Sequence, residues 1–372
     1  DMMKKAIVTG MGLVVWAAFA AEVGNSFLLQ TKSTTMAFKK DSGGAWNMIH
    51  YGAKAAKESD VQALAWNRWS GGNSIAYSAY GDKAQGQGIN KYGGLQVTHA
   101  DGCLTTYLEG VKAETIDDKP GVTHLVLTQK DRVYPFYVIQ HFRAMETCDV
   151  DETWVELRND EPGAVRLGRM DSIALDFPLL ANSFYLQSVC GQWAAEAQLT
   201  EAELAKGQTI SIGSRSGVRD AWEANASFML SVGGKATETS GRVIGGALCW
   251  SGSWGISVQR DHCDFIEVRG GADLSQGAYV LDAGKSITLP KFALTYSANG
   301  KGQISRNMHR WARDWQLPNG HKLRPVLLNS WEGSYFTFTE KVLHDMMDGV
   351  KEMGGELFVL DDGWFGTGKY AR

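Results

Sequence analysis

The sequence predicts a large antiparallel β-sandwich followed by a strand–helix–strand unit whose two strands are parallel. From Phe27 to about Leu289, short runs with alternating apolar and polar residues are separated by Gly, Asp and Asn, which is typical of a sandwich. From residue 325 onward, two apolar runs flank a segment with helical periodicity. Of the 372 residues, 44% are hydrophobic and 21% are charged, which is enough apolar material for a sizeable core.

The clearest strand patterns of the first part share a length of three to seven residues and flanking turn signals. They are residues 136–142, 153–157, 165–167, 228–230 and 255–259. After the last of the strands, Ile304, Met308, Trp311 and Trp315 recur at helical spacing. We expect this helix to link the sandwich to the following unit, with its Trp side chains used in packing.

The C-terminal unit begins with a strand at residues 325–332, which ends in Trp331 and Glu332. A second strand at 356–360 has four apolar residues in a row, so we expect it to be buried on both faces. Between them, a helix over 340–353 is predicted, with Thr337 or Thr339 as its N-cap and Gly354 at its end. Its apolar stripe, which we expect to be core, is Val342, Leu343, Met346, Met347, Val350 and Met353.

Two adjacent carboxylates, Asp361 and Asp362, follow the second strand, and Trp364 stands two residues further on. Parallel strands joined by a crossover helix end at the same edge of a sheet, so Trp331 belongs to that edge too. Ligands of α/β enzymes bind at this edge. Carboxylates accept hydrogen bonds from vicinal hydroxyls, and a Trp ring stacks on a sugar. The alternative is an Asp-Gly turn that merely closes a strand.

Several segments, in this order along residues 27–372, resemble glycoside hydrolase family 36, the microbial α-galactosidases. The opening of that family's catalytic barrel resembles Pro325-Val-Leu-Leu-Asn-Ser-Trp-Glu, Tyr335-Phe336 and Glu356-Leu-Phe-Val-Leu-Asp-Asp-Gly-Trp-Phe-Gly366. Upstream matches are His99-Ala-Asp-Gly102, Gly191-Gln-Trp193-Ala-Ala-Glu196, Ser214-Arg-Ser-Gly217 and Asn225-Ala-Ser-Phe228. The resemblance implies an N-terminal antiparallel β-supersandwich followed by the start of a (β/α)8 TIM barrel.

Three parts of the chain follow from this reading. We expect residues 1–20 to be a signal peptide, 21–315 to be the supersandwich with its C-terminal linker helix, and 323–372 to be the first strand–helix–strand of the barrel. A complete barrel of this kind needs about 250 residues, so we expect the barrel to be incomplete here.

The resemblance implies a retaining exo-α-galactosidase that removes terminal galactose from oligosaccharides or polysaccharides, without a cofactor or metal. In the family, the nucleophile lies in a Lys-Trp-Asp motif on a later strand and the acid/base Asp lies later still; we expect both beyond Arg372 and the fragment alone to be inactive. Retaining enzymes use two carboxylates about 5–5.5 Å apart. Asp361 and Asp362 are not expected to be that pair, because neighbours on a strand point to opposite faces. Instead they are expected to bind galactose hydroxyls.

Three further residues are expected to bind substrate. Trp331 resembles a wall of the same galactose subsite. Trp193 resembles a sandwich-domain Trp that reaches the site, in some members from a neighbouring subunit; a core Trp in a sheet is the alternative. Asp82 is the only acid of a loop that in the family carries Asp-Phe-Arg, and that motif is missing here. Whether the protein forms a homo-oligomer of the family type is therefore left undecided by the sequence.

Other functions remain compatible with the sequence. An α-N-acetylgalactosaminidase would use the same strand ends and differ in the pocket for the 2-substituent. A transglycosylase making raffinose-type sugars fits an exported protein less well. A non-catalytic sugar-binding protein is the alternative from a different class.

The N-terminal segment is typical of a signal peptide. Lys4 and Lys5 precede a mostly apolar stretch, residues 6–19, and Ala18-Phe19-Ala20 fits a cleavage site. The stretch is shorter than the about 20 apolar residues that span a bilayer, so we expect a secreted or periplasmic protein without a stable membrane anchor. The formal charge of −4, spread without long runs, argues against nucleic acid as a partner.

Five cysteines are an odd number without metal-type spacing, so no zinc site is implied. The sequence does not pair them, and buried free thiols are the expectation. They are Cys103, Cys148, Cys190, Cys249 and Cys263.

Overall fold

The computed structural model describes residues 21–23, 26–40, 44, 46–62, 93–116, 118–179, 181–217, 223–261 and 264–366. The predicted signal peptide, residues 1–20, lies outside this part of the chain. The chain divides into two compact units, Asp1–Trp311 and Ala312–Arg372, which are described separately below as unit 1 and unit 2. Within the described ranges, no helix is both long and apolar enough to cross a membrane.

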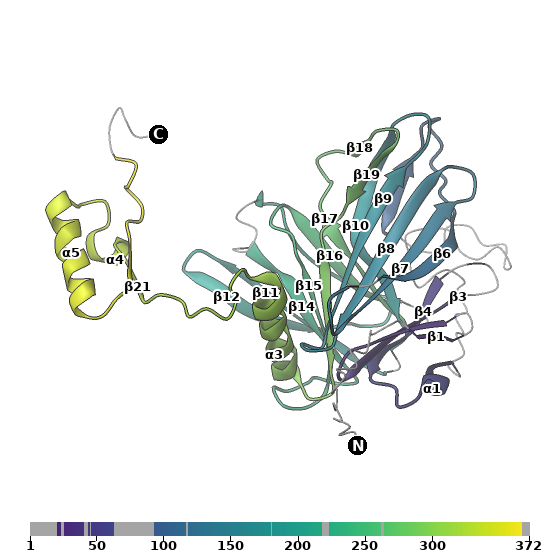
Figure 1. The fold of residues 1–372 in the computed structure, drawn as a ribbon, viewed down its shortest axis with the longest axis horizontal. Helices are drawn as coiled ribbons and strands as arrows, with labels where there is room; N and C mark the ends of the chain where they lie inside the picture. Colours follow the sequence, from purple (N-terminus) through teal and green to yellow (C-terminus); the bar gives the residue numbers. More distant parts are fainter. Residues whose placement is uncertain are drawn as a thin grey trace, which may run out of the picture. The chain divides into compact units, whose positions relative to one another are not determined.

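Unit 1 consists mostly of antiparallel strands (Figure 1). A four-stranded sheet contains β1 (Ala21–Val23), β2 (Ser26–Gln30), β3 (Thr34–Lys40) and β4 (Trp46–Ala53), and the short helix α1 (Glu58–Gln62) follows. A six-stranded sheet has the order β13 (Thr209–Ser214), β16 (Trp254–Arg260), β17 (Ile266–Ala272), β10 (Val165–Phe177) and β18 (Tyr279–Leu281), with β5 (Leu95–Thr98) also paired to β10.

The largest sheet of the described chain has ten strands. Its order is β12 (Ala195–Glu203), β11 (Phe184–Gln192), β14 (Ala224–Val232), β15 (Arg242–Leu248), β20 (Phe292–Ser297), β9 (Val150–Asn159), β8 (Phe136–Met145), β7 (Val122–Asp131) and β6 (Leu108–Ile116), with β19 (Lys285–Thr288) paired to β9. All five strand segments predicted from the sequence lie within β8, β9, β10, β14 and β16, so these predictions are confirmed.

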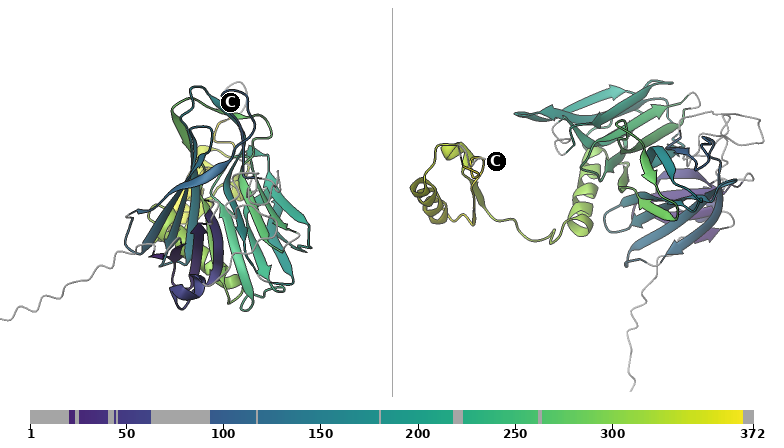
Figure 2. Two further views of the ribbon diagram at one scale, coloured as in Figure 1. Left: turned by 90° about the vertical axis from the view of Figure 1, so that its right-hand side faces the viewer. Right: turned by 90° about the horizontal axis from the view of Figure 1, so that it is seen from above.

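One hydrophobic core draws side chains from all three sheets. Phe38 on β3 and Phe142 on β8 are fully buried, with ring centroids 4.4 Å apart. Tyr51 on β4 meets Phe177 on β10 edge to face at 5.4 Å. The sheets are therefore layered against one another around a shared interior, as the two views of Figure 2 also show.

Helix α3 (Lys301–Trp311) packs on β20, β15 and β9, and it confirms the helix predicted from Ile304, Met308 and Trp311. Its Ile304, 1% exposed, joins a small cluster with Ala236 and Val243. The predicted helix does not run regularly through Trp315, because Ala312–Gln316 form a π-helical turn in unit 2.

A buried carboxylate, Glu152 on β9, fastens α3 to the ten-stranded sheet. Glu152 is 1% exposed; its Oε1 accepts a hydrogen bond from Trp311 Nε1 at 2.9 Å. Its Oε2 accepts from Arg143 Nη1 at 2.8 Å and from Lys291 Nζ at 3.1 Å. Two cations and one indole thus satisfy a charge that would otherwise be costly to bury.

Unit 2 contains β21 (Leu327–Asn329), α4 (Trp331–Ser334), α5 (Glu340–Glu352) and β22 (Leu357–Val359). The two strands are parallel, with Leu327 opposite Leu357 and Asn329 opposite Val359, which confirms the predicted strand–helix–strand unit. Thr339, and not Thr337, is the N-cap of α5, since its side chain accepts a hydrogen bond from the Val342 amide.

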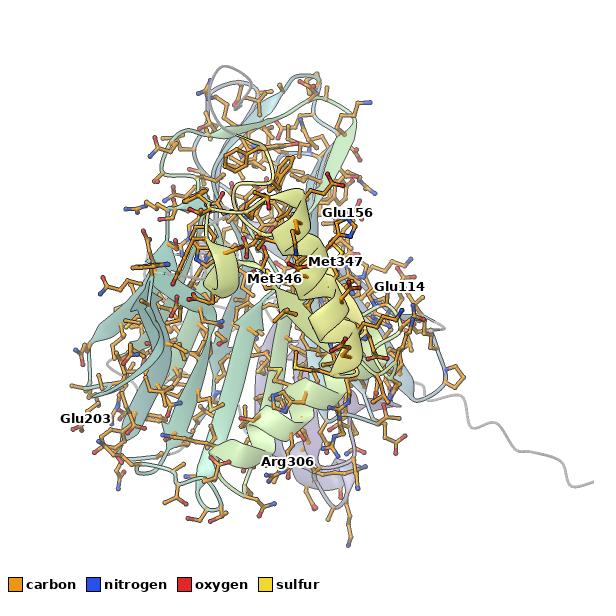
Figure 3. All side chains as sticks on the ribbon, turned by 90° about the vertical axis from the view of Figure 1, so that its left-hand side faces the viewer. Glu114, Glu156, Glu203, Arg306, Met346 and Met347 are labelled. Atoms are coloured by element: carbon orange, nitrogen blue, oxygen red, sulfur yellow. The ribbon has the colours of Figure 1, made fainter. Side chains whose placement is uncertain are left out.

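The predicted burial of unit 2 is wrong within the described residues. On β22, Leu357 is 42% exposed, and α5 has no buried residue. Met346 and Met347, labelled in Figure 3, lie on the apolar stripe of α5; Met347 is 38% exposed. A pair of strands with two helices has too few elements to enclose both a sheet face and a helix stripe. The predicted positions of the apolar residues are therefore right, whereas the prediction that they are buried is wrong.

Four cysteines lie in the described ranges and all are free, which agrees with the expectation of unpaired thiols. Their expected burial holds only for Cys148, whereas Cys190 and Cys249 are exposed and Cys103 is half-buried. Cys190 lies on β11 where this strand pairs with β12, whose side chains are nearly all exposed. Cys263 is outside the described residues.

The carboxylate of Glu152 can be tested by the change Glu152→Gln. A neutral amide no longer compensates Arg143 and Lys291, so we expect the free energy of unfolding to fall by about 2–4 kcal/mol. The measurement is urea unfolding followed by Trp fluorescence. Glu156→Gln is the matched control. Glu156, labelled in Figure 3, lies on the same strand, is half-buried and has no ion pair among the described residues. Equal losses in the two variants would contradict the role of Glu152.

Candidate carbohydrate site

The carboxyl ends of β21 and β22 lie at the same edge because the strands are parallel. Backbone and hydroxyl groups extend this pairing past the strand ends. The Ser330 amide donates to the Val359 carbonyl at 2.9 Å, and the Asp361 amide donates to Ser330 Oγ at 3.1 Å. Ser330 is 1% exposed, so this junction is rigidly enclosed and places the next residues of both strands side by side.

Asp361 is half-buried and both of its carboxylate oxygens accept hydrogen bonds. Asn329 Nδ2 donates to Oδ2, and the Asp362 amide donates to Oδ1 at 2.7 Å. Asn329 uses its other amide atom as well, since its Oδ1 accepts from the Trp331 amide at 2.8 Å. One Asn side chain therefore fixes both the carboxylate after β22 and the start of α4 after β21.

Asp362 is exposed and lies in a turn. One carboxylate oxygen accepts from the Gly363 amide at 3.1 Å, while the other has no protein partner within the described ranges. Gly363 is buried with φ of 91°, and a Cβ there would come within 3.1 Å of the Phe338 ring and 3.2 Å of Phe336. A side chain at this position would be strained by the positive φ and crowded by the two rings, which explains the glycine in the turn beside Asp362.

This turn corrects one step of the sequence argument. The two carboxylates were expected to point to opposite faces because they follow one another along a strand, but β22 ends at Val359 and Asp362 is already in the turn. The two carboxylates differ in their partners: Asp361 is held by Asn329, whereas one oxygen of Asp362 has no protein partner in the part of the chain that the structure describes.

Trp331 lies on α4 and not on the strand, because β21 ends at Asn329. Its half-buried ring meets Tyr335 at 5.2 Å and Phe336 at 4.9 Å, both nearly perpendicular. Tyr335 has φ of 45°, a left-handed conformation that a non-glycine residue rarely adopts. The Tyr335 hydroxyl donates to Glu332 at 3.0 Å, and this bond raises the pKa of Tyr335. Such strain is common where a side chain is positioned for a ligand.

The edge thus gathers acceptors and aromatic rings, which together suit a sugar. Trp364, beside the two Asp residues, is 71% exposed. Asn329 was not predicted as a site residue from the sequence, although a polar residue at the end of an apolar run was a usable signal. In the part of the chain that the structure describes, no three His, Cys, Asp or Glu side chains are grouped to hold a metal ion.

The structure does not bring the other two expected substrate-binding residues to this edge. Trp193 belongs to unit 1, in the turn of the β11–β12 hairpin where Gln192 pairs with Ala195. It is 75% exposed, so the alternative of a core Trp is wrong. Asp82 lies outside the described residues. The structure therefore brings together Asp361, Asp362 and Trp331, and it places Trp193 on a separate unit.

Known proteins similar to this chain agree on one family. Residues 44–282 match the family model for the glycosyl hydrolase family 36 N-terminal domain, and residues 286–371 match the Melibiase model. A probable α-galactosidase C of Aspergillus terreus is 31% identical over 268 residues, which is 71% of this chain and 35% of that protein. A bifunctional α-galactosidase/sucrose kinase of Mediterraneibacter gnavus is 27% identical over 367 residues, 91% of this chain and 38% of the relative.

Solved structures share the fold. The galactosidase domain of an α-galactosidase–sucrose kinase superimposes with a TM-score of 0.81 at 25% identity, and an α-galactosidase from Lactobacillus brevis with 0.80 at 26%. An α-galactosidase from Geobacillus stearothermophilus, solved in complex with raffinose, gives 0.81 at 22%. Each match covers 92% of this chain and about half of the solved one. This chain belongs to glycosyl hydrolase family 36.

Proposed function

We propose that the protein containing this chain is a retaining exo-α-galactosidase acting on melibiose- or raffinose-type sugars. The observation that carries the proposal is the edge of β21 and β22, where Asp361 and Asp362 stand beside Trp331. The relatives named above support the substrate class, since each bears the name α-galactosidase. This chain spans 35–38% of the two curated relatives, so activity is proposed for the whole protein.

The proposal assigns the two units to the parts of the family fold. Residues 21–315, most of unit 1 and the first residues of unit 2, are assigned to the β-supersandwich with its linker helix, and residues 323–372 of unit 2 to the first strand–helix–strand of an eight-stranded β/α barrel. The parallel pair β21–β22 with a helical crossover supports this, because βαβ repeats build such barrels. Active sites of barrels form at the carboxyl ends of the strands, where Asp361 and Asp362 lie.

In the proposed site, Asp362 offers its unoccupied oxygen to a sugar hydroxyl, and Asp361 accepts a hydroxyl beside it. Charge-assisted hydrogen bonds of this kind are stronger than neutral ones. They can distinguish the axial 4-hydroxyl of galactose from the equatorial one of glucose. Trp331 forms a wall of the same subsite, and Trp193 and Asp82 remain the further substrate-binding residues expected from the sequence.

Neither Asp carries the covalent chemistry in this proposal. Each oxygen of the Asp361 carboxylate accepts one bond from the protein, from Asn329 and from the Asp362 amide, which holds the group in place and leaves acceptor capacity for a sugar hydroxyl. The nucleophile and the acid/base of a retaining enzyme must flank the scissile bond about 5–5.5 Å apart, and we place both on later barrel strands.

An aryl α-galactoside tests the activity. We expect the full gene product to release the phenol, and the 372-residue chain alone to release no more than a heat-treated control. We also propose export, on the basis of the Lys4-Lys5 segment, so the activity should lie in the periplasm or the medium. If the 372-residue chain hydrolyses the substrate and Asp361→Ala abolishes this turnover, the placement of the catalytic residues is wrong. If the full gene product does not hydrolyse α-galactosides, the proposed function is wrong.

The binding role of the carboxylates predicts a graded loss. In the full gene product, Asp361→Asn and Asp362→Asn should each lower kcat/KM about 30- to 1000-fold, which corresponds to about 2–4 kcal/mol of lost hydrogen bonding. Added azide should not restore activity. Trp331→Ala should raise KM, while exposed Leu323→Ala serves as the control without effect. Rescue by azide with formation of a galactosyl azide would show that the altered Asp is the nucleophile.

A further inference from the structure

Unit 1 contains an open groove of ≈ 840 Å³ on its six-stranded sheet. Side chains of β5, β10, β13, β16 and β17 line it, together with the segments that follow β13 and β17. Figure 1 shows β10, β16 and β17 next to one another in this sheet. None of the lining residues belongs to unit 2, the unit that contains the edge of β21 and β22.

The floor of the groove is bare backbone. Strand pairing places Gly213 opposite Gly255, and Gly255 opposite Gly271, on the face away from the core. The intervening residues of β16, Trp254 and Ile256, are buried in the core. A Cβ added at Gly255 would meet no atom within 4 Å, so the space above the middle of the floor is open.

One wall is held in place by buried charges. Arg269 is 4% exposed, and its Nη2 lies 2.6 Å from Asp176 Oδ1. Asp171 is 5% exposed and bonds to Arg169 Nη2 at 2.7 Å. Since desolvation of a charge is costly, these pairs fix the guanidinium and carboxylate groups before any ligand arrives.

The other wall is polar and more accessible. Arg215 Nε lies 2.6 Å from Asp273 Oδ2, and the Ser214 hydroxyl donates to Glu223 at 3.0 Å. The lining contains three arginines and three carboxylates, so the groove has no net charge. The remaining polar lining residues supply hydroxyl and amide groups, and they are Gln96, Ser211, Ser257 and Ser275.

This lining selects the chemistry of a ligand. A polyanion would need net positive charge, and the charges here balance. An apolar ligand would need apolar walls, and the aromatic residue of the lining, Trp254, is 1% exposed. A ligand rich in neutral hydroxyls matches this lining. Carboxylates need a donor, guanidiniums need an acceptor and serines can use either, and each hydroxyl both donates and accepts a hydrogen bond.

We propose that this groove binds a neutral glycan chain, as a second carbohydrate site that takes no part in catalysis. The bare floor lets the chain lie against the sheet, and the two polar walls bond its hydroxyls. Such a site would hold the protein on a polysaccharide while the edge of β21 and β22 engages single galactose units. The inference stands on the groove alone and holds for a protein without α-galactosidase activity.

Affinity electrophoresis of the 372-residue chain tests it, in native gels containing glucomannan, mixed-linkage β-glucan or arabinoxylan. These neutral probes carry no α-linked galactose, so the proposed galactose site does not contribute. We expect one of them to retard the protein and dextran sulfate to have no effect. Gly255→Leu, which fills the open space, should weaken binding at least tenfold; Arg215→Gln, whose side chain is 73% exposed, should weaken it several-fold.

Gln259→Leu is the matched control, because Gln259 lies four residues along β16 on the same face and outside the groove lining. Its retardation should equal that of the unchanged chain. Urea unfolding verifies that the variants are folded. The proposal is overturned if no neutral glycan retards the chain, if only dextran sulfate does, or if folded Gly255→Leu and Arg215→Gln bind as the unchanged chain does. The proposal is also overturned if Gly255→Leu changes the sedimenting mass of the chain, and thus its oligomeric state, but leaves glycan binding unchanged.

Discussion

A hydrogen bond from Asn329 to Asp361 joins the ends of two parallel strands whose residues are 32 positions apart in the sequence. The bond is available because β21 and β22 pair in one register, with Asn329 opposite Val359. A shift by one residue would turn the Asn away and leave the carboxylate without its partner. The orientation of Asp361, the start of α4 and the turn that presents Asp362 all follow from this pairing.

Unit 1 provides a different kind of order, in which large sheets share one core and buried charges are neutralised locally. Glu152 bonds to α3 through Trp311, and Arg269 is held by Asp176 in the six-stranded sheet. Both arrangements leave polar groups in fixed positions at a high cost in desolvation. In the sheet with Arg269, this rigidity forms a wall of the groove.

Local patterns predicted much of this structure. Alternating residues located β8, β9 and β16, and periodicity located α5, with Thr339 as one of its two candidate caps. What the sequence did not predict depends on neighbours outside each segment. Trp331 was placed on a strand, but the bonds of Asn329 and Ser330 end β21 and begin a helix.

Burial was the least predictable property, because an apolar stripe shows only that a face is suited to packing. The stripe on α5 is real, yet none of its residues is fully buried, and Cys190 is exposed on a hairpin. At the site, Asp361 and Asp362 were found from their position after an apolar run. The hydrogen-bond partners of the two carboxylates depend on Asn329 and on the turn at Gly363. The spacing of residues in the sequence does not predict these partners.

The central claim is that the carboxylates at the ends of these strands recognise the 4-hydroxyl of galactose. The direct measurement compares kcat/KM for an aryl α-galactoside and its 4-deoxy analogue in the full gene product and in its Asp361→Asn and Asp362→Asn variants. If one of these carboxylates binds the 4-hydroxyl, the 4-deoxy analogue should lower kcat/KM much less in the variant that lacks this carboxylate than in the unchanged enzyme. The loss from the variant and the loss from the analogue are then not additive. Additive losses in both variants would contradict the account.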